Sequence, residues 1–328
     1  YTGNGSTQTI SGLNFSPDLV WIKSRSAAYA HLLYDTVRGA GLLLRSDGST
    51  AESGNSGDLL ASFNSNGFAV NNTYLGSPNP AANDNSQTYV AWTWDAGSST
   101  VTNTQGSISS QVRANASAGF SVLTWTGQTA AGTIGHGLGV APSLIICKAR
   151  SNAQSWGVYH KDTGINNYLL LDSTGASTAY SGIWGGSAPT STVFGVPGNV
   201  GLNNNNTWTY VAYCFAPVAG YSSFGTYVGT GSGEGSFVWT GFKTKWVMCK
   251  RSDSTGNWVL VDGVRTPYNV INTNLYPNAS NAEDNSFQID SLSNGFKVRS
   301  SGTDGNASGG TYIFAAFAQH PFQSSRAR

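Results

Sequence analysis

Charged side chains are scarce in this chain. They make up 10% of the 328 residues, whereas about 25% is usual for a soluble domain. The 17 Lys and Arg residues nearly balance the 16 Asp and Glu residues, and the basic residues form no run. A protein that binds nucleic acid or an anionic membrane surface carries a basic patch. The composition therefore predicts neither partner.

Long apolar runs are also missing. No stretch approaches the roughly 18 consecutive apolar residues of a membrane-spanning helix, and none resembles a signal peptide. No segment keeps apolar residues at helical spacing for three turns. The chain is nevertheless 39% hydrophobic and 12% aromatic, which is enough to bury a core. We expect a protein without membrane insertion, rich in strands.

Residues that bind metals or attack substrates are few. The three cysteines lie inside apolar runs without CxxC spacing, which predicts buried free thiols. The three cysteines are Cys147, Cys214 and Cys249. The alternative to three free thiols is a disulfide between Cys147 and Cys214. The oxygen-rich segments 46–58 and 281–286 could hold Ca²⁺, but they lack the fixed ligand spacing of a calcium loop. The four histidines are scattered, so we expect no metal and no cofactor.

One block of sequence occurs three times. Its copies are "YTGNGSTQTISGLNFSPDLVWIKSR" from Tyr1, "WTGQTAAGTIGHGLGVAPSLIICKAR" from Trp125 and "YVGTGSGEGSFVWTGFKTKWVMCKR" from Tyr227. Each copy runs from an aromatic residue through a Gly-rich turn and a strand to a lysine, and each is followed later by a related strand, "TYVAWTWDA", "TYVAYCFAP" or "TYIFAAFAQ". The equivalent lysines are Lys23, Lys148 and Lys250. Solenoid units span only about 20 to 50 residues, so this longer period predicts whole domains in tandem.

The repeats set the domain boundaries. A polar linker is expected at 98–111, between domains at 1–97, 112–218 and 219–328. The second and third domains open with the strands 119–127 and 221–229, whereas the first begins at the last aromatic residue of that strand. We expect the missing opening strand upstream of Tyr1, with another chain segment as the alternative. Because only "PVAG" joins the last two domains, we expect them to form a rigid pair and the first to hinge through the linker.

The repeated strand also indicates the fold class. Alternation places Tyr210, Ala212 and Cys214 on one face and Val211, Tyr213 and Phe215 on the other, and both faces are apolar. A strand buried on both faces lies centrally in a sheet of a two-layer sandwich or a tight barrel. Other runs rich in β-branched and aromatic residues are separated by Gly, Asn, Asp and Ser. The prediction is an all-β protein of three tandem antiparallel β-sandwich repeats, jelly-roll or lectin-like.

One acidic position recurs. Asp35, His160 and Asp262 are equivalent in the repeats, and Arg38 and Arg265 follow the two aspartates by three residues. A glycosidase needs two carboxyl groups facing each other across a cleft. One carboxylate in each repeat, replaced by His in the second, does not supply that pair. We interpret each Asp and Arg as a structural pair that fastens a loop, and we predict no catalytic residue.

Tryptophans are the candidates for ligand contacts. Trp184 and Trp208 lie in Gly- and Asn-rich loops, and Trp156 and Trp258 follow the Lys/Arg loop at equivalent positions. An aromatic face flanked by amides and hydroxyls suits a sugar ring. The alternative is that these side chains fill the core, as we expect for Trp21, Trp92 and Trp94.

The chain also resembles a known family. "LYDTVRG", "SNGF", the joint "TYVAYCFAPVAGYSSFGTYVGTG" and the ending "PFQSSRAR" are similar to the C-terminal repeat region of virion structural and tail-fibre proteins of marine bacteriophages, including those of cyanobacterial and pelagic hosts. The resemblance covers essentially the whole chain. It implies a place in the virion, on a tail fibre or other external appendage, beside other virion proteins. It supplies no catalytic residues.

Three functions compete at this point. The first is a non-enzymatic fibre or adhesin that contacts the host cell surface, with surface polysaccharide as the expected ligand. The second is a purely structural head-fibre, decoration or spacer protein, and the third is a glycan-degrading tailspike. Low charge, polar loops and the missing carboxylate pair favour the first. Because shallow amide-rich loops bind a sugar weakly, we expect a homo-oligomer, in particular a trimer, that gains affinity by avidity.

Overall fold

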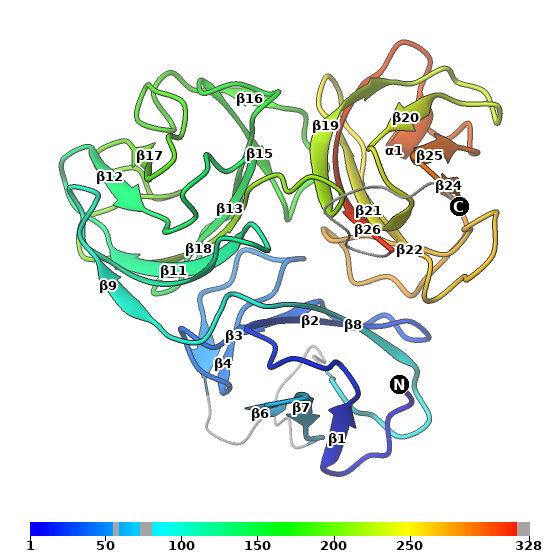
Figure 1. Cartoon of the computed structure of the whole chain (residues 1–328), viewed down its shortest axis with the longest axis horizontal. Helices are drawn as coiled ribbons and strands as arrows, with labels where there is room; N and C mark the ends of the chain where they lie inside the picture. Colours follow the sequence, from blue (N-terminus) through cyan, green and yellow to red (C-terminus); the bar gives the residue numbers. More distant parts are fainter. Residues whose placement is uncertain (55–58, 73–80, 320–328) are drawn as a thin grey trace.

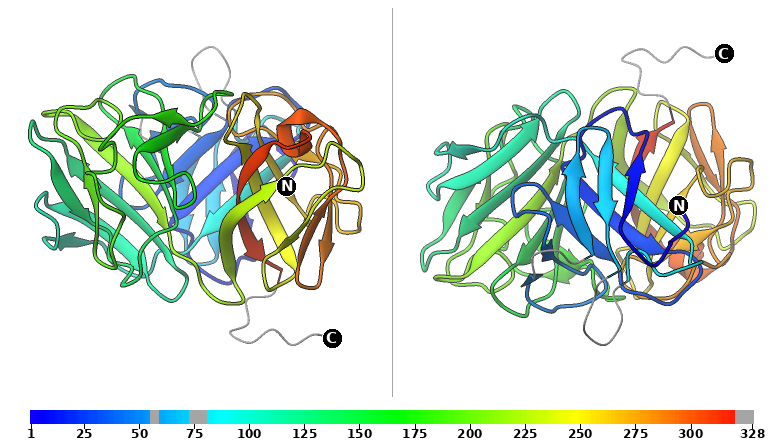
Figure 2. Two further views of the ribbon diagram at one scale, coloured as in Figure 1. Left: turned by 90° about the horizontal axis from the view of Figure 1, so that it is seen from above. Right: turned by 90° about the horizontal axis from the view of Figure 1, so that it is seen from below.

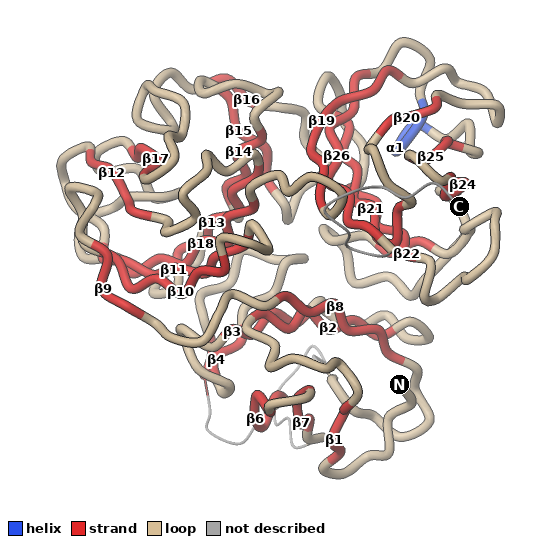
Figure 3. Tube along the Cα trace, in the orientation of Figure 1, coloured by secondary structure: helices blue, strands red, loops and turns tan. Residues whose placement is uncertain are grey.

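The chain is built almost entirely from antiparallel strands. The computed structural model describes residues 1–54, 59–72 and 81–319. Within these residues the strands form several antiparallel sheets, none of them closed, and one short helix, α1 (Thr303–Asn306). Figure 3 shows the strands joined by long loops. The all-β prediction is confirmed. The ending "PFQSSRAR", His320 and residues 55–58 of the oxygen-rich segment lie outside the described residues.

Residues 1–97, the first segment, contribute two three-stranded sheets. One has the order β3-β2-β8 and the other β1-β7-β6, and a hairpin joins β4 to β5. Their bounds are β1 (Gln8–Ser11), β2 (Leu19–Ser24), β3 (Leu32–Asp35), β4 (Leu42–Leu43), β5 (Ser53–Gly54), β6 (Leu60–Asn64), β7 (Gly67–Val70) and β8 (Tyr89–Trp94).

Residues 98–218 contribute an eight-stranded sheet and a two-stranded one. The order of the larger sheet is β16-β15-β14-β13-β18-β11-β10-β9, and β12 pairs with β17. The bounds are β9 (Val101–Asn103), β10 (Ser110–Asn115), β11 (Phe120–Thr126), β12 (Gly132–Gly135), β13 (Leu144–Ala149), β14 (Gly157–His160), β15 (Asn167–Leu170), β16 (Thr178–Ala179), β17 (Val193–Val196) and β18 (Thr209–Phe215). Residues 112–218 are called the second segment below.

Residues 219–319, the third segment, contribute a five-stranded and a three-stranded sheet. The orders are β19-β26-β21-β22-β23 and β20-β25-β24. The bounds are β19 (Ser222–Val228), β20 (Phe237–Trp239), β21 (Thr244–Arg251), β22 (Trp258–Asp262), β23 (Asn274–Leu275), β24 (Ile289–Leu292), β25 (Gly295–Val298) and β26 (Thr311–Ala318).

Strand register confirms that the three predicted lysines are equivalent. Lys23 pairs with Val90, Lys148 with Val211 and Lys250 with Ile313, so each lysine faces the same position of the repeated strand. All three lysine side chains are buried. Each ammonium donates to the carbonyl of the next residue, and Lys148 and Lys250 also reach a carbonyl of the neighbouring segment, that of Ser49 or Thr174.

Tyr1 occupies the position predicted for the end of an opening strand. Its ring stacks on Tyr89 with centroids 5.1 Å apart, as Trp125 stacks on Tyr210 at 5.2 Å and Tyr227 on Tyr312 at 5.0 Å. In the second and third segments the strands β11 and β19 continue along the edge of β18 and β26. In the first segment β8 ends the sheet order, and the described residues that pair along that side are Tyr1, Thr2 and Gly3, opposite residues 87–89.

The three segments share one hydrophobic core. In each segment the sheet that contains the repeated strand (β8, β18 or β26) turns toward a common centre and the other sheet lies outside, so that three units surround one axis (Figures 1 and 2). The central cluster takes buried side chains from all three, and three further clusters each belong to one segment. Trp94 shows the contact most directly. Its ring meets Phe120 and Phe215 of the second segment and Trp246 and Phe317 of the third at centroid distances of 5.9–6.2 Å.

This arrangement explains why the repeated strand is apolar on both faces. Tyr210, Ala212 and Cys214 belong to the cluster of the second segment, whereas Val211, Tyr213 and Phe215 belong to the central cluster. One face therefore packs within its own segment and the other against the other two segments.

Two expectations about the linker are wrong. Residues 98–111 are not merely a polar loop, because Val101–Asn103 forms β9, which pairs with β10 and extends the sheet of the second segment. The first segment is also not free to hinge. Trp21, Trp92 and Trp94 are buried in the core that all three segments share, and moving them away would expose that core to water.

The cysteines are buried free thiols, as expected, and there is no Cys147–Cys214 bridge. Burial raises the pKa of all three thiols, with the charge of Cys214 a further cause at Cys147. A thiol held protonated is a poor nucleophile and a poor metal ligand. The cysteines therefore pack as small apolar side chains.

Candidate functional site

Three of the four candidate tryptophans are core residues. Trp156, Trp184 and Trp258 are at most 1% exposed. Their indole N–H groups donate to backbone carbonyls, Trp156 to Arg45 at 2.7 Å, Trp258 to Leu170 at 2.8 Å and Trp184 to Asn167 at 3.0 Å. A ring covered on both faces cannot stack on a sugar, so the interpretation of these three as ligand contacts is wrong.

Trp208 is the fourth candidate. It is half-buried and packs against the cluster of the second segment. A Cβ placed on Gly201 would lie 3.1 Å from the indole, so this glycine lets the ring lie close to the backbone. The structure brings none of the four tryptophans together into a common surface. A ligand contact by Trp208 therefore remains a prediction, and no other candidate tryptophan lies on a surface with it.

The two Asp–Arg pairs are present where the sequence predicts them. Arg38 Nε contacts Asp35 at 2.5 Å and Arg265 Nε contacts Asp262 at 2.6 Å, with all four side chains buried. The arginine backbone N–H also donates to the same aspartate in each pair, which closes the loop after β3 or β22. Both carboxylates are thus fully engaged, and they have no free oxygen for acid–base chemistry.

Each pair continues across a boundary between segments. At the boundary of the first and second segments, the Tyr213 hydroxyl donates to Asp35 at 2.9 Å. Arg38 also contacts Glu52 at 2.9 Å, and Glu52 pairs with Arg150 of the second segment at 2.8 Å. Burial would raise the pKa of Glu52, but the Arg150 hydrogen bond and the Arg38 charge outweigh it and lower that pKa.

The boundary of the third and first segments repeats this network. The Trp92 indole N–H donates to Asp262 at 3.0 Å. Arg265 contacts Glu283 at 3.2 Å, and Glu283 pairs with Arg25 of the first segment at 2.8 Å. Burial would raise the pKa of Asp262, but the charge and hydrogen bonds of Arg265 lower it. The charged groups therefore hold segments together.

The boundary of the second and third segments lacks these charges. His160 stands in the aspartate position, and one ring nitrogen lies 3.3 Å from the Phe314 carbonyl. Burial lowers the pKa of His160 to about 4, against the opposing charge of Asp162, so the imidazole is neutral at pH 7. Ser177 and Ser252 stand where the other boundaries have a Glu and an Arg, and they keep only the backbone N–H to carbonyl bond that all three boundaries share. This boundary is held by packing, by backbone hydrogen bonds and by the side-chain bonds of Lys250 and Trp258 to carbonyls of the second segment.

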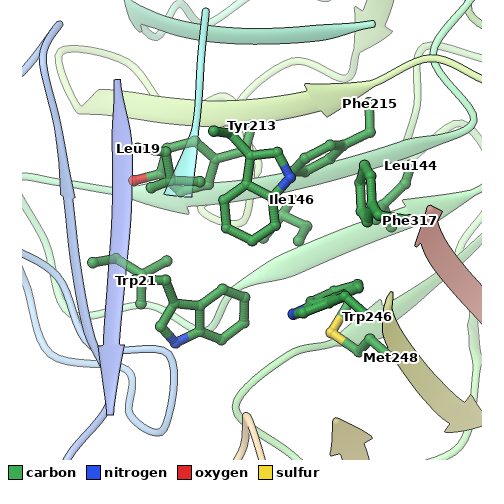
Figure 4. A pocket seen from close by; sticks show the side chains of 11 residues that line it. Leu19, Trp21, Leu144, Ile146, Tyr213, Phe215, Trp246, Met248 and Phe317 are labelled. Atoms are coloured by element: carbon green, nitrogen blue, oxygen red, sulfur yellow. The ribbon is translucent and has the colours of Figure 1, made fainter. Parts of the chain in front are cut away.

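The centre of the molecule has no room for a ligand. Figure 4 shows the cavity on the shared core, lined by Trp21, Tyr213, Trp246, Phe317 and other apolar side chains. Its volume is about 10 Å³, at the lower limit of what a single water requires. In the parts of the chain that the structure describes, no three His, Cys, Asp or Glu side chains gather to hold a metal ion. The same residues contain no helix long and apolar enough to span a bilayer.

An open hollow lies between the first two segments. Its volume is about 690 Å³, and Asp95, Arg113 and Asn115 line it with small residues. Arg113 pairs with the buried Asp18 at 2.7 Å, and the Asn115 amide donates to Asp95 at 3.1 Å. The hollow presents no aromatic ring, and it is a weaker candidate than the surface described next.

Two exposed aromatic residues were missed by the sequence analysis. Phe237 and Trp239 of β20 are 48% and 68% exposed, while Val238 between them is buried in the cluster of the third segment. They lie on the outer face of the sheet β20-β25-β24, where β20 is an edge strand. Alternation in "SFVWTG" was the available signal, because it places both rings on the face opposite Val238.

Charged side chains adjoin these rings. Lys297 lies directly opposite Phe237 on β25, and Asp290 lies opposite Lys297 on β24. Glu234 pairs with Lys297 at 2.6 Å and with Arg299 at 2.5 Å, and Arg299 pairs with Asp290 at 2.7 Å. The hydrogen bonds from Lys297 and then Arg299 lower the pKa of the exposed Glu234. The surface thus joins two aromatic faces to a balanced set of donors and acceptors.

Comparison with protein families gives one match, which covers residues 1–321 and carries the description Domain of unknown function (DUF7483). The chain belongs to this family. Comparison with curated proteins and with solved structures gives no match. The match spans the whole repeat region of this DUF7483 chain as one unit.

Proposed function

We propose that this chain is a non-enzymatic fibre or adhesin module of a bacteriophage virion, which projects from the particle and contacts the host cell surface. The observation that carries the proposal is the exposed pair Phe237 and Trp239. Trp21, Trp92, Trp94, Trp156 and Trp258 all serve the shared core, whereas Trp239 contributes to no hydrophobic cluster and is 68% exposed. Aromatic side chains left in water on a rigid surface are typical of binding sites.

The proposal includes the repeat architecture. Each segment places one sheet toward the shared core and a second sheet outside it, around its own hydrophobic cluster, in support of three tandem antiparallel β-sandwich repeats. The common strand order supports it as well, since β11-β18-β13-β14-β15 has the same relation to the sequence as β19-β26-β21-β22-β23. The jelly-roll or lectin-like character is part of the same proposal.

Weak binding at a single site favours a homo-oligomer. A shallow surface with two exposed aromatic rings gives a ligand few contacts, so affinity near the millimolar range is expected. Assembly into a homo-oligomer, for which a trimer is the favoured state, multiplies the surface and raises the apparent affinity about a hundredfold or more. Other virion proteins and host surface polysaccharide are the remaining partners. Nucleic acid and membrane insertion are not part of the proposal.

A purely structural role as a head fibre, decoration protein or spacer is the second candidate. The shared core and the buried ion pairs at two boundaries favour it, because they fix the three segments in one rigid body. A tailspike enzyme is less consistent with the geometry, since the buried carboxylates of Asp35 and Asp262 are each engaged by an arginine.

Two measurements separate the first two functions. Antibody labelling in electron micrographs locates the chain on the particle, and the purified chain is tested as a competitor of particle adsorption to host cells. The adhesin proposal expects an exposed appendage and inhibition of adsorption. Labelling of an appendage without any inhibition by the chain, even when it is assembled, would favour the spacer role.

A further inference from the structure

We infer that the outer face of β20 binds a pyranose ring of a host-surface polysaccharide, with Trp239 and Phe237 as the stacking residues. This inference rests on the proposed adhesin function and names the ligand class and the residues for it.

The two rings form one surface. Residues two apart on a strand point to the same side and are separated by about 7 Å, so Phe237 and Trp239 stand next to each other on the outer face. Both rings lie over glycine. A Cβ placed on Gly295 would be 3.1 Å from the Phe237 ring, and one on Gly241 would be 3.2 Å from the Trp239 indole. The absence of side chains beneath them lets the rings lie low on the sheet.

The fold itself does not require these aromatics. Strand register places Val238 opposite Phe296, as Ile10 lies opposite Phe68 and Ile134 opposite Phe194. The residues equivalent to Phe237 and Trp239 are therefore Thr9 and Ser11 in the first segment, and Thr133 and Gly135 in the second. In both other segments the equivalent strand forms with small residues at these two positions. The aromatic pair is a property of the third segment alone.

A packing role accounts for only part of the pair. The Phe237 ring covers the backbone at Gly295, which is a known way to protect a glycine in a sheet. Trp239 is 68% exposed, so burial against the protein gains it little. A large apolar side chain kept in water at an edge strand also invites unwanted strand pairing. A ligand that covers the indole accounts for the exposed tryptophan at this position.

The rim of the surface favours a sugar over a protein partner. The C–H face of a pyranose packs on an aromatic ring while its hydroxyls need donors and acceptors close by. Lys297, Arg299, Glu234 and Asp290 supply both kinds within the same sheet face. These charges also confine the apolar area to two rings, far less than the roughly 800 Å² per partner of a stable protein interface.

Binding to oligosaccharides tests the inference directly. The probes are neutral and acidic trisaccharides, followed by polysaccharide extracted from host cells, titrated against the full chain by NMR and by Trp fluorescence. We expect Trp239→Ser to weaken binding at least tenfold and Phe237→Thr to weaken it less. Both substitutions install the residue that the first segment carries at the equivalent position, so the fold is retained, and thermal unfolding checks this. Val228→Thr changes a 56% exposed side chain of the same segment and serves as the control with unchanged binding.

Cell binding separates this inference from the adhesin function. If Trp239→Ser loses adsorption to cells but no saccharide binds the parent chain, the adhesin function stands and the sugar assignment is wrong. If saccharide binds equally well to the parent chain and to Trp239→Ser, the site is wrong. If the parent chain binds neither cells nor saccharide in the assembled state, both proposals are overturned. Loss of saccharide and cell binding together in Trp239→Ser, with Val228→Thr unaffected, supports both.

Discussion

The hydroxyl of Tyr213 donates a hydrogen bond to Asp35 at 2.9 Å and accepts one from Arg38 at 3.2 Å. The three residues are buried, and they join the second segment to the first. Trp92 makes the corresponding contact with Asp262 between the first and third segments. The loop closed by each Asp–Arg pair thus hydrogen-bonds to an aromatic side chain on the repeated strand of the neighbouring segment.

Removing that hydroxyl should cost stability without removing the ring. Tyr213→Phe leaves the aromatic contact in the shared core but takes a donor from a buried carboxylate. We expect the free energy of unfolding to fall by about 1–3 kcal/mol, measured by urea denaturation. Tyr180→Phe, at a ring that is 45% exposed, is the matched control and should change stability by less than about 0.5 kcal/mol. Equal effects of the two substitutions would show that the Asp35 contact contributes nothing.

The buried ion pair should be costly to break but easier to replace. Arg38→Thr leaves Asp35 buried without its cation, and a loss of about 3–5 kcal/mol is expected. The double variant Asp35→His/Arg38→Thr copies His160 and Thr163, the residues of the second segment at these positions. It should recover part of the loss, because no buried charge is left unpaired.

Urea denaturation of the two variants and the parent chain measures this difference. A double variant no more stable than Arg38→Thr alone would mean that the charges themselves, rather than their mutual compensation, are required at this boundary.

The repeats could be found from the sequence because similar residues follow in the same order in each copy. Lys23, Lys148 and Lys250 were matched as the lysines that end the three copies of the repeated block, and strand register bears that out. Sequence reasoning also recognised that Tyr213 and Phe215 face apolar surroundings. It did not identify those surroundings as the other two segments, because alternation shows which side a residue faces and not which part of the chain covers it.

The candidate site was misplaced for the same reason. Trp156 and Trp258 follow polar loops, so their sequence context looks exposed, but carbonyls of Arg45 and Leu170 in the neighbouring segment receive their N–H groups. Trp239 was overlooked although its strand alternates plainly. Comparing it with Ser11 and Gly135, its equivalents in the other repeats, would have singled it out without coordinates.

The repeated lysines give the protein an unusual pH dependence. Burial is the main cause that lowers the pKa of Lys23, Lys148 and Lys250 to about 8, from 10.5. Between pH 8 and 9 the unfolded chain keeps these protons while the folded chain releases them. The unfolded state therefore binds more protons, and the free energy of unfolding rises with pH.

The rise should be on the order of 2 kcal/mol from pH 8 to 9. From about pH 8 the cysteines offset part of it, because burial raises their pKa in the folded state and only the unfolded thiols ionise. Urea denaturation at pH 7, 8 and 9 measures the curve, and Lys250→Met should lose about a third of the lysine effect. Stability that is flat or falling between pH 8 and 9 would contradict the assignment of these lysines as buried ammonium groups.

The shared core should make the three segments unfold together. Trp94 belongs to the first segment, but its ring contacts Phe120, Phe215, Trp246 and Phe317 of the other two. Trp94→Ala removes a large buried side chain at the point where all three meet, and a loss of about 3–5 kcal/mol is expected. Because the cavity opens onto every inner sheet, hydrogen exchange should accelerate in β2, β13 and β21 alike. Trp208→Ala is the control, since this half-buried ring packs only against the cluster of the second segment, and its effect should be smaller and confined there. Faster exchange in β2 alone, with β13 and β21 still protected, would show that the first segment separates from a stable remainder. That result would support the expectation that the first segment hinges through residues 98–111.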